Sequence, residues 1–120
     1  MSVPAGATHG TDAVELRVPA EPASLATVRL FSASVGTAFG VSADVTEDLK
    51  LVLSELCAGS VGVSDTFRVT VASISGQLRV ECRGTAWASG PDADRRKGIL
   101  EALLPDVDYS ADVVSFALDL

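Results

Sequence analysis

Several short stretches of the chain alternate apolar with polar residues, which is the pattern of β-strands that have one buried and one solvated face. Residues 14–18 form the first of these stretches. Residues 66–74 and 78–83 form two more, and the Ser-Gly pair between them is a turn sequence, so together they predict a β-hairpin. Residues 113–120 predict a final strand.

Longer stretches repeat apolar residues every three or four positions, which indicates amphipathic helices. The first predicted helix covers residues 23–39 and ends before Gly40. Ser42 is a suitable N-cap for the second helix, and acidic residues in its first turns favour the helix dipole. This second helix is expected to end near Gly62, and a third covers residues 92–104 and stops at a proline.

The order of these elements, β-α-α-β-β-α-β, predicts an α+β two-layer sandwich in which a mostly antiparallel sheet has its helices on one face. Residues 1–12 are small and polar and predict a flexible N-terminal tail, so the domain is expected to cover residues 13–120. Residues 84–94, which contain Trp87, predict a loop. A chain of 120 residues has room for one hydrophobic core.

The composition narrows the classes of partner. Hydrophobic residues make up 48% of the chain and charged residues 21%, which favours a buried core over intrinsic disorder. The formal net charge of -7 repels phosphate backbones and anionic lipids, so neither nucleic acid nor a membrane is expected as a partner. No apolar run has the length of a membrane span, and residues 1–10 lack signal-peptide features, so a cytoplasmic location is expected.

The residues that most often form metal, redox or nucleophilic sites are few. Cys57 and Cys82 lie in apolar stretches without a metal or redox spacing, so we expect two buried, reduced thiols rather than a disulfide or a redox switch. The single histidine, His9, lies in the predicted tail, and no metal site is predicted. Ser54 and Ser60 have no histidine to activate them, which excludes a serine hydrolase.

One segment of the second predicted helix resembles a known sequence box. Residues 54–60 read Ser-Glu-Leu-Cys-Ala-Gly-Ser, and residues 29–31 of the first helix read Arg-Leu-Phe. With the order of elements, these segments resemble the GHKL or Bergerat fold of anti-sigma-factor serine kinases over about residues 13–120. The resemblance implies that Glu55 stands where the family keeps its catalytic general base. Gly59 stands where the family has the asparagine that binds Mg²⁺, and a glycine has no side-chain oxygen to offer a cation.

The other nucleotide boxes of the family are matched only in part. The second box follows the hairpin, where the chain has Gly84 but no aspartate for the adenine amino group. The third, a glycine-rich helix opening that contacts phosphates, corresponds to residues 95–99, in which Gly98 matches and Lys97 precedes it. The loop 84–94 is short for the lid that closes over ATP in the family. The resemblance therefore implies Gly59, Gly84, Lys97 and Gly98 as the candidate cofactor-binding residues of a degenerate family member.

Each candidate residue also has a purely structural interpretation. Glu55 is either a catalytic base or a relic that is salt-bridged or solvated. Residues 95–97 either bind an anion or form a solvated basic face, and the sequence favours the solvated face. Arg29 lies where the resembling family contacts its sigma factor, and it is equally well a plain surface arginine. Trp87 either covers the vacated nucleotide pocket or meets a partner.

Two functions follow from the resemblance. The first is a regulatory protein that resembles an anti-sigma factor and binds a sigma factor or an anti-sigma antagonist without a cofactor. The second is an ATP-dependent protein serine/threonine kinase that uses Mg²⁺, Glu55 as base and Arg96 or Lys97 on the phosphates. The sequence favours the first, because magnesium, adenine and phosphate contacts act together in phosphoryl transfer. Family members often pair, so the resemblance also allows a homodimer.

Overall fold

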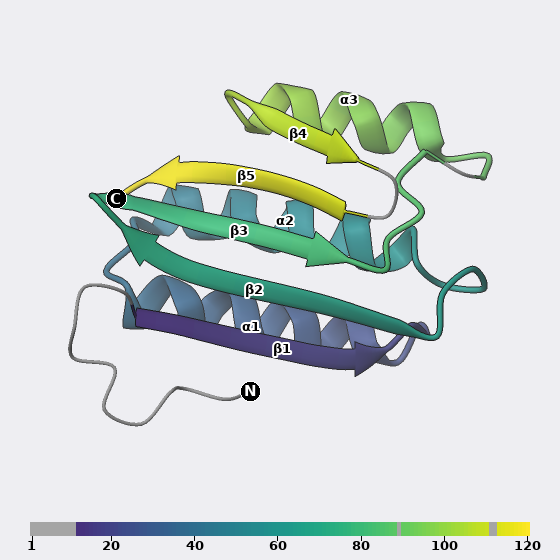
Figure 1. Cartoon of the computed structure of the whole chain (residues 1–120), viewed down its shortest axis with the longest axis horizontal. Coiled ribbons are helices and arrows are strands. Elements are labelled where there is room, and N and C mark those ends of the chain that lie inside the picture. The colour runs from purple at the N-terminus through teal and green to yellow at the C-terminus, as the bar shows by residue number, and fades with distance from the viewer. Residues whose placement is uncertain (1–11, 89, 111–112) are drawn as a thin grey trace.

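Within the described residues, 12–88, 90–110 and 113–120, five strands form one antiparallel sheet with the order β1-β2-β3-β5-β4 (Figure 1). The strands of this computed structural model are β1 (Asp12–Pro19), β2 (Thr66–Ile74), β3 (Gln77–Arg83), β4 (Val107–Ser110) and β5 (Val113–Asp119). The helices are α1 (Ser24–Ala38), α2 (Ala43–Ala58) and α3 (Ala93–Leu103). The predicted α+β two-layer sandwich is therefore confirmed.

The core lies between the sheet and the two helices α1 and α2, which lie side by side behind the sheet in Figure 1. Every second residue of each central strand points into this layer, which is why the strands read as alternating sequences. The central side chains that α1, α2, β2 and β3 contribute are Val28, Phe31, Val35, Leu49, Val52, Leu53, Leu56, Phe67, Val69, Val71, Leu78 and Val80. The third helix, α3, packs against α2 beyond the β4 edge of the sheet.

The sequence missed one strand, β4, so the chain ends in two strands rather than one. This edge strand pairs with β5. Its residues do alternate, because Val107 and Tyr109 pack against the core while Asp108 is exposed. A strand of 4 residues gives too few repeats to be separated from a loop by periodicity.

The second helix ends earlier than the predicted Gly62, because α2 stops at Ala58. Both the amide and the hydroxyl of Ser60 donate to the carbonyl oxygen of Cys57, which closes the chain into a turn. Gly62 follows with a φ of 78°, a left-handed conformation that glycine adopts without strain. Gly59 is therefore the first residue after α2, and it lies beside the candidate site described below.

Residues 1–11, which make up most of the predicted tail, lie outside the described residues, as does residue 89 of the predicted loop. Strand β1 begins at Asp12, next to the expected start of the domain. Within the described ranges, no helix combines the length and the apolar composition that crossing a membrane requires.

The two cysteines are both buried and reduced, as the sequence predicted. Burial raises the pKa of the Cys57 thiol, and a hydrogen bond with Ser60 lowers it by a smaller amount. Burial also raises the pKa of Cys82, and the negative charge of Glu81 and the nearby Cys57 side chain add to that effect. Both thiols therefore stay protonated at neutral pH and react poorly.

We expect neither cysteine of the native protein to react with a disulfide reagent such as DTNB at about pH 8, where an exposed thiol of ordinary pKa, about 8.5, reacts readily. In urea both should react, giving two equivalents of released thiolate per chain. The measurement is absorbance of the released product. Rapid reaction of the native protein would contradict the burial of Cys57 and Cys82.

Candidate functional site

Glu55 lies near the end of α2, the helix that carries the resembling sequence box. The helix starts where the sequence predicted, because the Ser42 hydroxyl accepts a hydrogen bond of 3.3 Å from the Val45 amide. Glu55 is only 7% exposed, and its carboxylate accepts hydrogen bonds from both terminal nitrogens of Arg95, at 2.6 and 3.3 Å. Glu55 is therefore one partner of an ion pair that joins α2 to α3.

Arg96 follows Arg95 on α3, but its side chain is buried, at 5% exposure. Its Nε donates to the backbone carbonyl oxygen of Glu55 at 3.2 Å. Its Nη1 donates to the backbone carbonyl oxygen of Trp87 at 2.9 Å. A buried guanidinium is tolerable only when such acceptors replace water. One side chain therefore connects α3 to the end of α2 and to the loop after β3.

Gly59 provides the space that this guanidinium occupies. A Cβ atom at position 59 would lie 2.9 Å from Cζ and 3.0 Å from Nε of Arg96. Real Cβ atoms essentially never approach heavy atoms to within 3.0 Å, so any larger residue would displace the Arg96 side chain. Gly59, for which the sequence resemblance implied a role in cofactor binding, is thus covered by an arginine of the same chain.

The side chain of Trp87, in the loop after β3, packs against β4. Its ring stacks on that of Tyr109, with 4.1 Å between the ring centroids and 35° between the planes. The Tyr109 hydroxyl is buried without a hydrogen-bond partner among the described residues. Burial raises the pKa of Tyr109, and the nearby charge of Glu101 adds to the shift. Within the loop, the buried Thr85 hydroxyl donates to the Leu56 carbonyl oxygen at 2.8 Å and so holds it against α2.

The remaining cofactor candidates, Lys97, Gly98 and Gly84, do not join this cluster. The ammonium of Lys97 is exposed and lies 3.9 Å from Glu101 on the same helix. Gly98 lies in the middle of α3, whereas only the first-turn amides of a helix lack helical partners, so the predicted phosphate contact does not fit its position. Gly84 has a φ of 82°, and a Cβ there would collide with the carbonyl oxygen of Thr66, which explains this glycine by packing.

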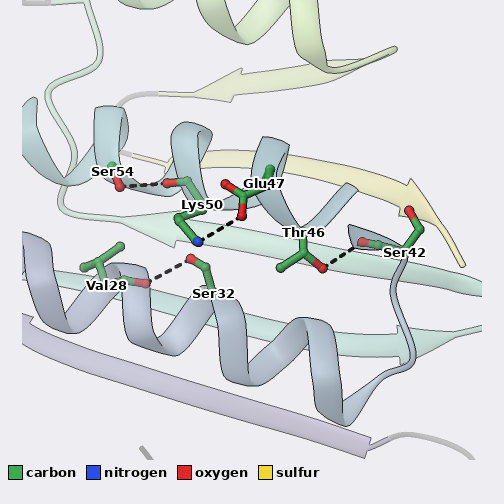
Figure 2. A network of polar contacts seen from close by, with 7 residues as sticks. All are labelled: Val28, Ser32, Ser42, Thr46, Glu47, Lys50 and Ser54. Carbon is green, nitrogen blue, oxygen red and sulfur yellow. Dashed lines mark hydrogen bonds and ion pairs between the residues drawn. The ribbon is translucent and has the colours of Figure 1, made fainter. Parts of the chain in front are cut away.

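Arg29, the predicted partner contact, lies in a separate hollow between α1 and α2. The hollow measures about 410 Å³ and is lined by Arg29, Glu47, Asp48, Lys50, Leu51 and Ser54. Figure 2 shows that the polar contacts of this region stay within each helix: Ser32 donates to the Val28 carbonyl, and Lys50 pairs with Glu47 at 3.1 Å. Among the residues that the structure describes, the charged groups around Arg29 therefore do not join the two helices.

The predicted solvated basic face at residues 95–97 is wrong for Arg96, which is buried. Helical spacing carried a signal for this, because Arg96, Leu100 and Leu104 follow one another at intervals of four and all three are buried. Tyr109 was also missed, since nothing in its local sequence indicates that Trp87 stacks on it.

Two known proteins match part of the chain, and no family model matches it. The serine-protein kinase RsbW of Bacillus velezensis is 40% identical over 50 residues, which are 42% of this chain and 31% of that protein. RsbW of Bacillus subtilis is 36% identical over 53 residues, or 44% of this chain and 33% of that protein. The chain thus matches about a third of the length of these two kinases.

The likeness to RsbW makes ATP and Mg²⁺ the cofactors to test against the geometry. Mg²⁺ requires oxygen ligands in a nearly octahedral arrangement. In the part of the chain that the structure describes, no group of three or more His, Cys, Asp or Glu side chains could hold a metal. Position 59 offers no side-chain oxygen, and the Arg96 guanidinium lies against it. These residues do not fit a magnesium ion bound between Glu55 and position 59.

The substitution Arg96→Ala should lower the free energy of unfolding by about 3 kcal/mol, because the Trp87 carbonyl oxygen loses its donor, the Glu55 carbonyl oxygen keeps only the Gly59 amide, and a cavity remains. The matched control is Lys97→Ala on the same helix, whose exposed pair with Glu101 should contribute less than about 0.5 kcal/mol. Urea denaturation followed by circular dichroism measures both. Equal, small losses for the two variants would show that Arg96 does not connect α3 to α2.

Proposed function

We propose that the chain is a regulatory protein of the anti-sigma-factor type that binds a sigma factor or an anti-sigma antagonist and does not depend on ATP. In this proposal it is a degenerate GHKL domain, formed by residues 13–120 and acting in the cytoplasm. The observation that supports it most is the position of Arg96, whose guanidinium lies against Gly59 where the resembling family binds magnesium. The partial likeness to RsbW supports the choice of regulatory class.

The energetics of the two arginines differ, and that difference matters for nucleotide binding. The Arg95 side chain is 58% exposed, whereas the Glu55 side chain that it pairs with is 10% exposed. Arg96 is buried, and moving it away would break its hydrogen bonds to the buried Glu55 carbonyl oxygen and to the part-buried Trp87 carbonyl oxygen. The Glu55 carbonyl oxygen would keep the Gly59 amide as a donor, but the guanidinium would need new acceptors or water.

A nucleotide would therefore need binding energy of its own to displace Arg96. That cost adds to the missing magnesium ligand at Gly59 and to the absence of an aspartate among residues 84–90, directly after β3. Glu55 alone cannot compensate, because phosphoryl transfer depends on positioning and charge neutralisation by several groups together. These considerations favour a binding protein over a kinase.

The hollow between α1 and α2 is the surface that fits a protein partner in this proposal. Arg29 lines it, and arginines are enriched among the residues that dominate binding energy. Leu51 in the same hollow is 46% exposed, and Leu30, next to Arg29 in the chain, is 71% exposed. Exposed leucines beside charged groups give the apolar centre and polar rim that protein interfaces have.

The proposal predicts that the purified chain binds one of the sigma factors or anti-sigma antagonists encoded in the same genome, with a similar Kd in the presence and absence of ATP and Mg²⁺. Arg29→Glu should weaken binding tenfold or more. Arg79→Glu, on the opposite side of the sheet, is the matched control and should change the Kd by less than about twofold. Isothermal titration calorimetry measures these values.

Two results would contradict the proposal. One is that none of these proteins binds. The other is binding that requires ATP, or transfer of phosphate to a serine of the partner, which is what the alternative, an ATP-dependent serine/threonine kinase, predicts.

A further inference from the structure

The face of the sheet that points away from α1 and α2 carries a row of three arginines. Arg17 on β1 is the register partner of Arg68 on β2, and Arg68 is the register partner of Arg83 on β3. The row crosses the sheet where β1 and β3 end and β2 begins, toward the right in Figure 1. Together with Thr66 and Gly84, these arginines line a hollow of about 400 Å³.

Folding alone does not explain this row, because like charges directly opposite each other on neighbouring strands destabilise a sheet. Two carboxylates compensate it in part. Glu15 lies 3.9 Å from Arg17 and 3.5 Å from Arg68, and Glu81 lies 2.9 Å from Arg83. Three cations thus share two anions, and the three arginine side chains remain 64%, 38% and 47% exposed. The row presents net positive charge on a chain whose formal net charge is -7.

The arginines keep hydrogen-bond donors for a ligand. Within the described residues, Arg68 and Arg83 make their ion pairs through Nε, whereas the terminal nitrogens Nη1 and Nη2 are also able to bind a carboxylate. Neighbouring strands lie about 4.8 Å apart, so the outer two arginines of the row are roughly 10 Å apart. One phosphate or carboxylate group is too small to contact all three, whereas successive acidic side chains of a polypeptide can.

We propose that this arginine row binds an acidic segment of a partner protein, which lies across the ends of β1, β2 and β3 and pairs several carboxylates with the three guanidinium groups. Charge complementarity determines the choice of occupant, since the row is a local positive surface on an acidic chain. The surface lies on the other side of the sheet from Arg29, and this inference does not rest on the proposed function.

The test uses the full chain and a fluorescein-labelled peptide of alternating glutamate and serine as the probe, with binding followed by fluorescence anisotropy at low salt. We expect saturable binding that weakens steeply as salt is added, because the contacts are exposed ion pairs. Arg68→Gln, at the centre of the row, should weaken binding about tenfold, since it removes a charge-assisted donor group. Circular dichroism and urea denaturation would check that this variant folds.

The matched control is Arg79→Gln. Arg79 lies on the same strand and the same face as Arg83, but its register partners are Ala72 and Ala117 rather than arginines. The Arg79→Gln substitution removes the same charge from the same face of the sheet. It should change the affinity for the peptide by less than about twofold.

Four results would overturn the proposal. The first is no saturable binding of the peptide, and the second is an equal loss in the Arg68→Gln and Arg79→Gln variants, which would indicate a diffuse charge effect. The third is displacement of the peptide by an equal concentration of inorganic phosphate, which would indicate a site for small anions. The fourth is self-association of the chain that Arg68→Gln abolishes in sedimentation, which would make a second copy the occupant.

Discussion

The buried guanidinium of Arg96 is the contact on which the arrangement of this protein's candidate site depends. It donates to the backbone of α2 at Glu55 and to the backbone of the loop at Trp87, so α2, this loop and α3 meet at one side chain. A cation is tolerated at 5% exposure only because fixed carbonyl oxygens replace water around it. Gly59 is part of the same arrangement, since a Cβ there would press on the guanidinium.

The chain is similar to part of two serine-protein kinases, but the Arg96 contact occupies the place where the resemblance would put a nucleotide site. The sheet and the helices α1 and α2 form a complete core without any cofactor. The carboxylate of Glu55 is paired with Arg95, and its backbone carbonyl oxygen accepts a hydrogen bond from Arg96. The candidate site is therefore held by interactions within the chain. Two surfaces on opposite sides of the sheet are accessible to a partner, the hollow at Arg29 and the arginine row at Arg68.

The sequence predicted the parts of the structure that repeat with a regular period. The alternation in β2 and β3 and the three-to-four spacing in α1 and α2 reflect burial on one face, so the two-layer fold followed from them. Short or local features did not follow: β4 has 4 residues, and α2 ends at Ala58 because of a turn at Ser60 that no periodicity records. The sequence therefore failed at the ends of elements and at the edge of the sheet, because individual hydrogen bonds rather than residue periodicity determine the structure there.

The site was predictable only in part, for a different physical reason. Glu55 and Gly59 were singled out because they lie in a segment that resembles a known sequence box, in which Glu55 matches and Gly59 replaces an asparagine. The side chains that contact them come from α3, about 40 residues further along the chain. Basic residues in a row read as a solvated surface, and only their helical position separates the exposed Arg95 from the buried Arg96. The stacking of Trp87 on Tyr109 likewise depends on β4, the strand that the sequence did not reveal.

The most direct test is an NMR measurement of the Arg96 Nε–H signal, assigned by its loss in an Arg96→Lys variant, during titration with ATP and Mg²⁺. We predict that this signal exchanges slowly with water, because Nε–H is buried and bonded to the Glu55 carbonyl, and that its chemical shift does not change at millimolar nucleotide. The Nε–H of exposed Arg79 should exchange fast in the same sample. Fast exchange at Arg96, or a saturable shift of its signal with ATP, would contradict the claim that this arginine closes the site.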